Sequence, residues 1–473
     1  MSYSELSPEL NNQRLARLPQ LNHLRQPPSS SDLDPNSYRP EIIDHHTSSG
    51  IDRLAGLISQ CPLPEQNITI RPFLKGVDEL ISLDGFFKRA FEDVDFTGSD
   101  AIIQVRDQVA QRLIQASQGV IEKSQIDILL TENTLVPDLT TLIQRVSQYS
   151  VPEALEAESK WIWDPLDLTL TKFIGPDAKR TLSASRVLGL IPFDAINRIQ
   201  TTRFRVLGAS VAASTIDLLV ALGAEDIVFV DGGLLDPSNE GKMLGDMADF
   251  RSNGESKAMI LMHQMYKRNP YGSYLGYSGK VVTLDESKGP YDKTIDELVK
   301  DADEVIEVVD SAHMKIYTRF YMQGQYPSTP IGFIADVGSQ PFAGREVPSE
   351  GNFFHQNLSN EEKQRMEMLL AETDKVRIAT EGLRSVYQMV RRNFPPEHQL
   401  QFLLSSLGMI PFWSQTPISA RESAATYAKI FIREVSGENI TFDQAPRTLI
   451  KELSEEQIRT IQAICKKVFD IQS

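Results

Sequence analysis

The sequence predicts an α/β fold in which a mostly parallel sheet lies between helical regions. Two observations lead to this class. Short, continuously apolar runs alternate with amphipathic segments between residues 204 and 309, and such runs are typical of parallel strands that helices cover on both faces. Before residue 150 and after residue 358, apolar residues instead recur three and four positions apart, which is the period of a helix.

The most informative segment is FRVLGASVAASTIDLLVALGAEDIVFVDGG, which begins at residue 204. It predicts a strand over 204–207, a turn at Gly208, a helix over 211–222 that stops at Gly223, and a second strand over 227–230. Asp231 follows at the strand end, 23 residues after Gly208, where a carboxylate can accept hydrogen bonds from a ribose. The segment therefore predicts a Rossmann-like βαβ unit that binds a nucleotide.

The elements that follow are expected to bring further charged residues to the same edge of the sheet. Lys257 lies in an amphipathic helical segment, and Asp310 ends an apolar run. Because the carboxyl ends of parallel strands face the crevice where such sheets bind ligands, we expect Lys257, Asp231 and Asp310 to converge. The elements predicted here are a helix within 254–270, a strand over 280–284, a helix over 295–302 with Thr294 and Glu297 as its capping box, and a strand over 305–309.

Five short motifs occur in one order along this region: VLGASVAAS, VDGG, SNEGKM, GESK and EVVD. Their order and spacing resemble V-x-G-x-G-x-x-G-S, V-D-x-D, S-N-x-x-R-Q, G-x-x-K and D-x-x-D of the ThiF/MoeB-type adenylyltransferases, the bacterial relatives of ubiquitin-activating enzymes. The resemblance covers Phe204 to Gly338, with Arg186 upstream of it.

This resemblance implies ATP-dependent activation of a carboxylate, usually the C-terminus of a small protein or peptide, as an acyl-adenylate. Phosphate transfer of this kind depends on positioning and on neutralisation of charge by cations, including Mg²⁺. By position, Asp231 would hold the ribose beside Gly208 and Ser210. Asn239 and Lys242 would approach the phosphates, and Lys257 would bind them. Asp310 would hold Mg²⁺, and Arg186 would correspond to an arginine supplied from a preceding or partner segment.

The sequence also departs from these motifs, so other functions stay open. Ser210 and Ala213 stand where the second and third glycines would be, Lys242 replaces an arginine, Gly233 replaces the second acid, and Glu307 replaces the first aspartate of D-x-x-D. A nucleotide-binding interaction protein without turnover is therefore the alternative. An NAD-dependent oxidoreductase is a third hypothesis, which Asp231 favours and the cationic Lys257 opposes.

The number and positions of the cysteines limit which acyl-transfer steps and metal sites we expect. The chain has two cysteines, Cys61 and Cys465, and neither lies in the stretch after Asp310 where ubiquitin-activating enzymes carry their acyl-accepting cysteine. Cys465 alternates with apolar residues at helical spacing, which favours a core position. We therefore predict activation without an enzyme thioester, and, in the absence of paired C-x-x-C motifs, no structural zinc.

The composition argues against several classes of protein. The formal charge of −16 argues against nucleic acid as a partner, since phosphate binding requires a basic surface. No apolar run approaches the roughly 18 residues that span a bilayer, and the N-terminus lacks a signal pattern. With two cysteines, these features predict a cytoplasmic protein. The family resemblance adds the expectation of a homodimer.

The flanking regions carry no chemical motif. We expect Trp161 and Trp163 to pack at a domain junction, and the polar stretch 340–357 to form a loop across the mouth of the sheet. Further helices are predicted over 360–373, 376–393, 397–407, 420–435 and 454–471. The predicted organisation is a flexible N-terminal arm (1–60), a mainly helical domain (61–175), the nucleotide-binding domain (176–345) and a helical C-terminal region (346–473).

Overall fold

The chain divides into two compact units. The computed structural model describes residues 39–44, 46–60, 73–116, 121–131, 135–164, 169–187, 190–235, 243, 256–283, 289, 292–309, 311–337, 340–350, 360–370, 372, 417–438 and 459–460. One unit, here called the sheet unit, comprises residues 1–40, 200–431 and 440–445. The other, here called the helical unit, comprises residues 41–199, 432–439 and 446–473.

The sheet unit is built on six strands in the order β11-β10-β9-β4-β5-β6. All neighbouring strands pair in parallel except β10 and β11, which pair antiparallel. The predicted α/β class with a mostly parallel sheet is therefore confirmed. The strands are β4 (Arg203–Leu207), β5 (Asp226–Val230), β6 (Ser273–Tyr277), β9 (Glu304–Glu307), β10 (Ile331–Val337) and β11 (Gln340–Glu346), and two short strands, β7 (Val281–Val282) and β8 (Lys293–Thr294), form a separate parallel pair.

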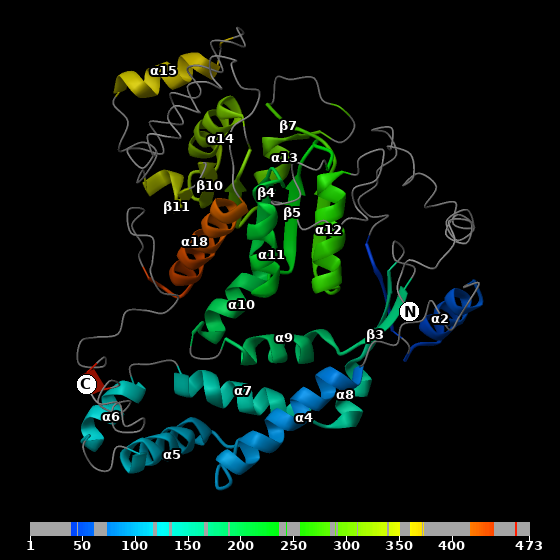
Figure 1. Cartoon of the computed structure of the whole chain (residues 1–473), viewed down its shortest axis with the longest axis vertical. Helices are drawn as coiled ribbons and strands as arrows, with labels where there is room; N and C mark the ends of the chain where they lie inside the picture. Colours follow the sequence, from blue (N-terminus) through cyan, green and yellow to red (C-terminus); the bar gives the residue numbers. More distant parts are fainter. Residues whose placement is uncertain are drawn as a thin grey trace. The chain divides into compact units, whose positions relative to one another are not determined.

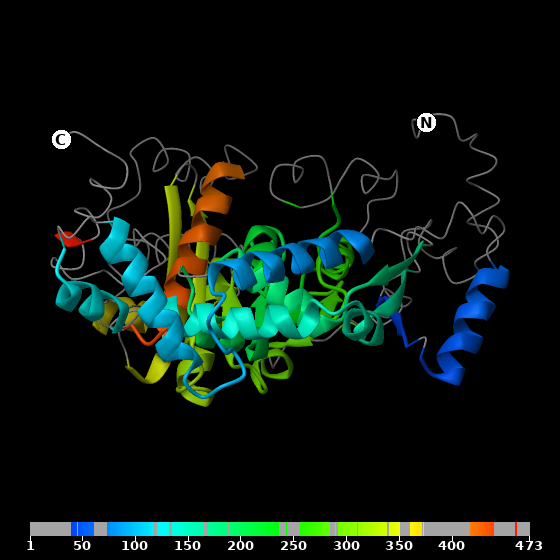
Figure 2. The same ribbon diagram turned by 90° about the horizontal axis from the view of Figure 1, so that it is seen from below.

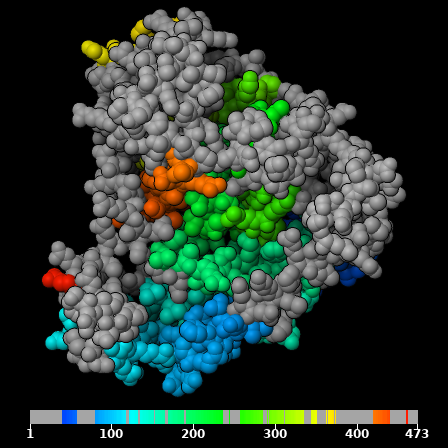
Figure 3. All heavy atoms as spheres, in the orientation of Figure 1, coloured from blue at the N-terminus to red at the C-terminus, as the bar shows by residue number. Residues whose placement is uncertain are grey.

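Helices cover both faces of this sheet, which explains why most residues of its central strands are buried (Figure 1). On one face, Leu207, Val305 and Ile331 belong to a buried cluster that also contains residues of α13 and α14. On the other face, Phe204 makes an edge-to-face contact with Phe431 of α18. Helix α18 lies beside the green atoms of the sheet unit in Figure 3, and its last residues belong to the helical unit. The helices of the sheet unit are α11 (Ala213–Ala221), α12 (Lys257–Arg268), α13 (Ile295–Val299), α14 (Ala312–Gln325), α15 (Asn360–Leu370) and α18 (Pro417–Val435).

The strand order places a topological switch point between β4 and β9. From the central strand β4 the chain proceeds to β5 and β6 on one side, and then to β9, β10 and β11 on the other. Ligands of open α/β sheets bind outside the carboxyl ends of the strands at such a switch point. The ends of β4, β5 and β9 are therefore the place to look for a functional site.

Two predicted elements of this unit were wrong, and several were confirmed. The third strand of the sheet is β6 at 273–277, whereas the predicted strand over 280–284 contributes only the two residues of β7. The polar stretch predicted as a loop over 340–357 begins with strand β11, because its backbone pairs along the whole length of β10. The helices expected near 211–222, 254–270, 360–373 and 420–435 are present, and Thr294 and Glu297 form the predicted capping box. The helices expected over 376–393 and 397–407 lie outside the described residues, as does nearly all of the one over 454–471.

The helical unit combines a helical array with a three-stranded antiparallel sheet, β1-β2-β3. Helices α4 and α7 run side by side in both views (Figures 1 and 2). Trp161 and Trp163 lie on β2 and pack against a small core formed by Ile43, Leu57 and Leu170 within the helical unit. Their predicted packing role is confirmed, and their predicted place at a domain junction stays a prediction. The elements are β1 (Glu41–Ile43), α2 (Ser48–Gln60), α4 (Phe73–Ala90), α5 (Ala101–Ala116), α6 (Lys123–Thr131), α7 (Leu135–Tyr149), α8 (Pro152–Glu158), β2 (Lys160–Asp164), β3 (Thr169–Phe173), α9 (Pro176–Ser185) and α10 (Phe193–Thr201), the last of which ends in the sheet unit.

Candidate functional site

The turn after β4 requires a glycine at position 208. Gly208 has a φ of +96°, a left-handed conformation that residues with a Cβ rarely adopt. A Cβ there would also stand 3.1 Å from the carbonyl oxygen of Val308, which follows β9. The N–H of Gly208 donates to the carbonyl oxygen of Val230 at 3.0 Å. The turn thus joins the carboxyl ends of β4, β5 and β9 at the switch point.

Asp231, the acid predicted to hold a ribose, lies beside this turn. Its Oδ2 accepts a hydrogen bond from the N–H of Ala209 at 2.9 Å, and its Oδ1 accepts one from the N–H of Gly233 at 2.7 Å. A carboxylate oxygen has two acceptor positions, so each can accept a further donor. The side chain is half-buried. It therefore orders the turn and can still receive hydroxyl groups of a ligand.

Lys257 comes to the same place from the first residue of α12. The point where a Cβ of Gly233 would stand lies 2.9 Å from Asp231 Oδ1 and 3.1 Å from Lys257 Nζ, so the two side chains converge on it. Within the described part of the chain, no carboxylate oxygen lies within ion-pair distance of the Lys257 ammonium. The helix dipole disfavours a cation at a helix N-terminus. A half-buried lysine at this place would be stabilised by an anionic group of a ligand.

Helix α11, which follows the Gly208 turn, differs from other helices of the sheet unit at its N-terminus. Helices α12, α13 and α14 begin with Ser256, Thr294 and Ser311, and each of these side chains accepts a hydrogen bond from the first turn. Helix α11 begins at Ala212 with no side-chain cap. The first N–H groups of a helix require acceptors, and a bound anion can supply them.

The structure reveals an ion pair at this edge that the motifs do not predict. Lys315 Nζ of α14 lies 2.9 Å from Glu307 Oε1 at the end of β9, and the same oxygen accepts the N–H of Val309 at 2.9 Å. Both side chains are buried, and Glu307 Oε2 has no hydrogen-bond partner among the described residues. The sequence alone provides no clear signal for this pair, because the burial of Lys315 and Arg319 is known only once α14 is placed against the sheet.

Lys315 also lies over an aromatic ring. Its Nζ is 4.6 Å from the centre of the Phe333 ring on β10, and the Arg319 guanidinium carbon is 5.3 Å from the same centre. Arg319 forms an ion pair with Glu346 of β11. The two cations therefore attach α14 to three neighbouring strands, and this helix begins directly after Asp310.

Of the remaining predicted site residues, the structure describes only Ser210 and Arg186. Ser210 lies half-buried in the turn after β4, where its carbonyl oxygen accepts the N–H of Ala213 at 3.4 Å. Arg186 is the C-terminal cap residue of α9 in the helical unit, so its predicted approach to the nucleotide stays a prediction. Asn239, Lys242 and Asp310 lie outside the described residues.

Metal binding and membrane insertion can be addressed for the described residues only. Among them, no group of three or more His, Cys, Asp or Glu side chains could hold a metal ion. The predicted Mg²⁺ ligand, Asp310, is not one of them, so this prediction stays untested. No helix within the described ranges is both long and apolar enough to span a membrane.

Comparison with known proteins gives weak structural likenesses. No protein-family model and no curated protein matches the sequence. Among solved structures, E. coli MccB with AMPCPP and MccA is 14% identical, with 64% of this chain and 80% of that chain covered and a TM-score of 0.36. A succinimide-bound structure of E. coli MccB is 13% identical, covered over 55% of this chain and 63% of that chain, with a TM-score of 0.33.

A third match, PaaA, is 12% identical, with 56% of this chain and 73% of that chain covered and a TM-score of 0.35. In three of the MccB structures this chain spans less than two thirds of the matched chain. Likenesses at these identities and scores support no statement about the activity of this chain.

Proposed function

We propose that this chain is an ATP-dependent adenylyltransferase that activates the C-terminal carboxylate of a small protein or peptide as an acyl-adenylate. The main support is that the Lys257 ammonium and the Asp231 carboxylate both lie within about 3 Å of the position that a Cβ of Gly233 would take, beside the Gly208 turn. The uncapped start of α11 supports an anionic ligand at the same edge. The order of the five motifs supplies the reaction class.

The proposed reaction joins a carboxylate oxygen of the substrate to the α-phosphorus of ATP and breaks the bond to pyrophosphate. A carboxylate needs no proton removed before this attack, so the site requires no general base. Catalysis rests on positioning and on cations that offset the charge of the phosphates. Asp231 would accept the ribose hydroxyls, the N–H groups at the start of α11 would face phosphate oxygens, and Lys257 would contact the phosphates.

The other predicted residues complete this proposal. Asn239 and Lys242 would approach the phosphates, and Arg186 would add a further cation. Asp310 would hold Mg²⁺, which when bound neutralises phosphate charge. Neither cysteine follows Asp310 closely in the sequence, so we propose transfer of the acyl group to an amine, a sulfur donor or water rather than to an enzyme thioester. A homodimer in the cytoplasm is part of this proposal.

The test is exchange of labelled pyrophosphate into ATP, measured with purified protein and a panel of candidate peptides and small ubiquitin-like proteins. The wild type should exchange, and Lys257→Ala and Asp310→Ala should each lose about 100-fold in rate, the size expected for loss of one preorganised charged group. Lys267→Ala is the matched control, because Lys267 is an exposed lysine in the last turn of the same helix. A wild type that binds no adenine nucleotide would overturn the proposal.

A second candidate is a nucleotide-binding interaction protein without turnover. It is favoured by Asp231, whose two carboxylate oxygens already accept backbone N–H groups, and by the departures at Ser210 and Gly233. Saturable binding of Mg·ATP that depends on Lys257, without exchange for any substrate in the panel, would support this candidate over the enzyme.

A further inference from the structure

The carboxylate of Glu307 holds one peptide group at the end of β9. Its Oε1 accepts a hydrogen bond from the N–H of Val309 at 2.9 Å and another from Lys315 Nζ at 2.9 Å. The pairing of β9 with β10 ends where Glu307 lies opposite Phe333, so the N–H of Val309 lies beyond the ladder. The side chain of Glu307 therefore supplies the acceptor that a neighbouring strand would otherwise supply.

The same peptide group faces the Gly208 turn. Its carbonyl belongs to Val308, and a Cβ at Gly208 would stand 3.1 Å from the carbonyl oxygen, 3.2 Å from the carbonyl carbon and 3.3 Å from the nitrogen of Val309. The N–H of Val308 donates to the carbonyl oxygen of Leu207, directly before the turn, at 2.9 Å. Because a peptide group is planar, a hydrogen bond that fixes its N–H also fixes the direction of its carbonyl. Glu307 thus determines which group the turn packs against.

Stability alone gives no reason for a charged pair at this place. Glu307 is fully buried, and its Oε2 has no hydrogen-bond partner among the described residues. A buried ion pair can often be replaced by apolar residues of similar volume without loss of stability, whereas a buried oxygen without a donor costs free energy. An apolar side chain could fill the same space, but it could not accept the N–H of Val309. Acceptance of this hydrogen bond is the property that the carboxylate adds.

We propose that Glu307 is a positioning residue for nucleotide binding, which acts by holding the peptide group between Val308 and Val309 against the Gly208 turn. This inference rests on the proposed function, in which the nucleotide binds at that turn. Lys315 has a supporting role, because its ammonium neutralises the buried carboxylate. The nucleotide need not contact either side chain, since the effect reaches it through the backbone.

Two double variants separate the hydrogen bond from the charge. Glu307→Gln/Lys315→Met removes both charges and keeps an oxygen that can accept the N–H of Val309. Glu307→Met/Lys315→Met removes both charges and the acceptor, with a side chain of nearly the same length. The experiment is isothermal titration of the purified full chain with ATP and Mg²⁺, below the unfolding midpoint of each variant. We expect the first variant to bind within about twofold of the wild type and the second to bind about tenfold more weakly, the size of one lost hydrogen bond.

A matched control is available on the same helix. Arg319 lies one turn after Lys315 and forms a buried ion pair with Glu346 of β11, which lies on the other side of β10 from β9. Arg319→Met/Glu346→Gln removes this pair and should bind ATP within about twofold of the wild type. If Glu307→Met/Lys315→Met does not fold, Glu307→Leu/Lys315→Met takes its place, because leucine also lacks an acceptor.

The inference is wrong if the variant without the acceptor binds ATP as tightly as the wild type. It is also wrong if the variant that keeps the acceptor loses as much affinity, since the charges would then be the cause. An equal loss in the Arg319 and Glu346 control would show a general effect of how α14 packs. A wild type that binds no ATP would overturn the proposed function as well, so failure of the inference alone is recognised by a wild type that binds it.

Discussion

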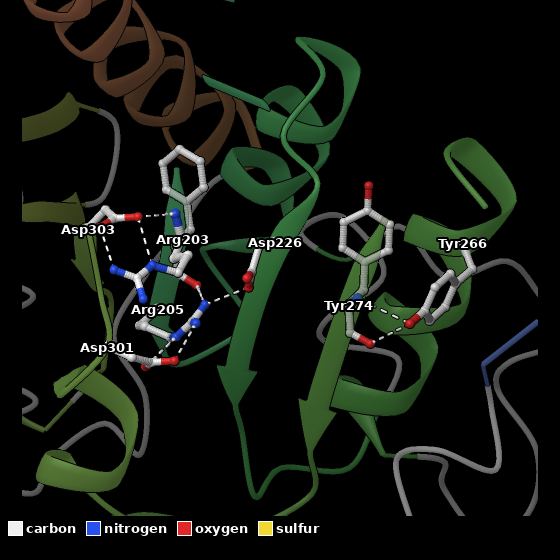
Figure 4. Close-up of polar contacts among 8 residues, drawn as sticks. Arg203, Arg205, Asp226, Tyr266, Tyr274, Asp301 and Asp303 are labelled. Carbon is white, nitrogen blue, oxygen red and sulfur yellow. Dashed lines mark hydrogen bonds and ion pairs between the residues drawn. The ribbon is translucent and has the colours of Figure 1, made fainter. Parts of the chain in front are cut away.

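Charged side chains of the described residues are paired at the amino end of the parallel sheet and only partly paired at its carboxyl end. At the amino end, Arg205 is almost fully buried, but its guanidinium donates to Asp226 at 2.8 Å and to both carboxylate oxygens of Asp301, at 3.2 and 2.9 Å. Beside it, Arg203 donates to Asp303 through its backbone and its guanidinium (Figure 4). At the carboxyl end, Glu307 has one oxygen without a partner among the described residues, and Lys257 has no acid at ion-pair distance within them.

This difference shows which end of the sheet leaves polar groups available to a ligand. Buried charges that are paired and hydrogen-bonded hold elements together, whereas unmatched groups cost free energy unless a ligand satisfies them. Glu307 and Lys257, the two such groups named among the described residues, lie at the carboxyl end of the sheet, where ligands of such folds bind. Breaking pairs at either end should therefore separate effects on folding from effects on nucleotide binding.

The largest effect is expected from Lys315→Met, which would leave Glu307 buried without its cation. Removing one partner of a buried ion pair typically costs about 3–5 kcal/mol, because the other charge remains in a medium of low polarity. We expect a loss of this size in the free energy of unfolding, measured by urea denaturation at pH 7.

The double variant Glu307→Gln/Lys315→Met is the control for this prediction. It removes both charges and leaves an amide oxygen that can accept the Val309 N–H. We expect it to lie within about 1 kcal/mol of the wild type, since neutral replacements of buried pairs are often tolerated. If the single and double variants were equally destabilised, the pair would not be the cause.

Much of the sheet unit could be predicted from sequence because its signals are local. The strand over 204–207, the glycine turn and the capping box of Thr294 and Glu297 each depend on a few adjacent residues. Strand β11 could not be predicted in the same way, because QPFAGRE is polar. Its charged residues are satisfied by distant partners: Arg345 binds Glu304 and Glu346 binds Arg319.

The same distinction applies to the site. The general rule that strand ends face a common crevice was enough to predict that Asp231 and Lys257 lie close together. The pair of Glu307 with Lys315 depends on how α14 lies across β9 and β10, which the sequence does not state.

A smaller effect is expected at the amino end, from Arg205→Met. The variant loses hydrogen bonds to two acids, but the side chains of Asp226 and Asp301 are 37% and 49% exposed and stay hydrated. We therefore expect a loss of about 2 kcal/mol at pH 7 rather than the larger value for Lys315, with nucleotide affinity unchanged.

The pH dependence of this loss has a defined sign. The hydrogen bond from Arg205 holds the pKa of Asp301 below its ordinary value, and the one from Arg203 does the same for the pKa of Asp303. A lowered pKa contributes stability above the pKa of the unfolded chain, about 4, and this contribution is lost as the pH falls through the folded value. Urea denaturation between pH 7 and pH 3 should show Arg205→Met approaching the wild type below pH 4. A constant difference across this range would contradict the role of Asp301.

The smallest effect on folding, and the most direct comparison of a binding with a structural position, is expected from two glycines. Gly208 and Gly223 both have left-handed backbones, with φ of +96° and +106°. Alanine at either should cost about 1–2 kcal/mol, the penalty of that conformation for a residue with a Cβ. A Cβ at Gly223 would meet only the flexible side chain of Gln200, whereas one at Gly208 would press on the carbonyl of Val308 and move the turn that Asp231 holds. Gly208→Ala should therefore be the less stable of the two variants, and titration with ATP should show weaker binding only for Gly208→Ala. Equal affinities would mean that the turn after β4 does not take part in binding the nucleotide.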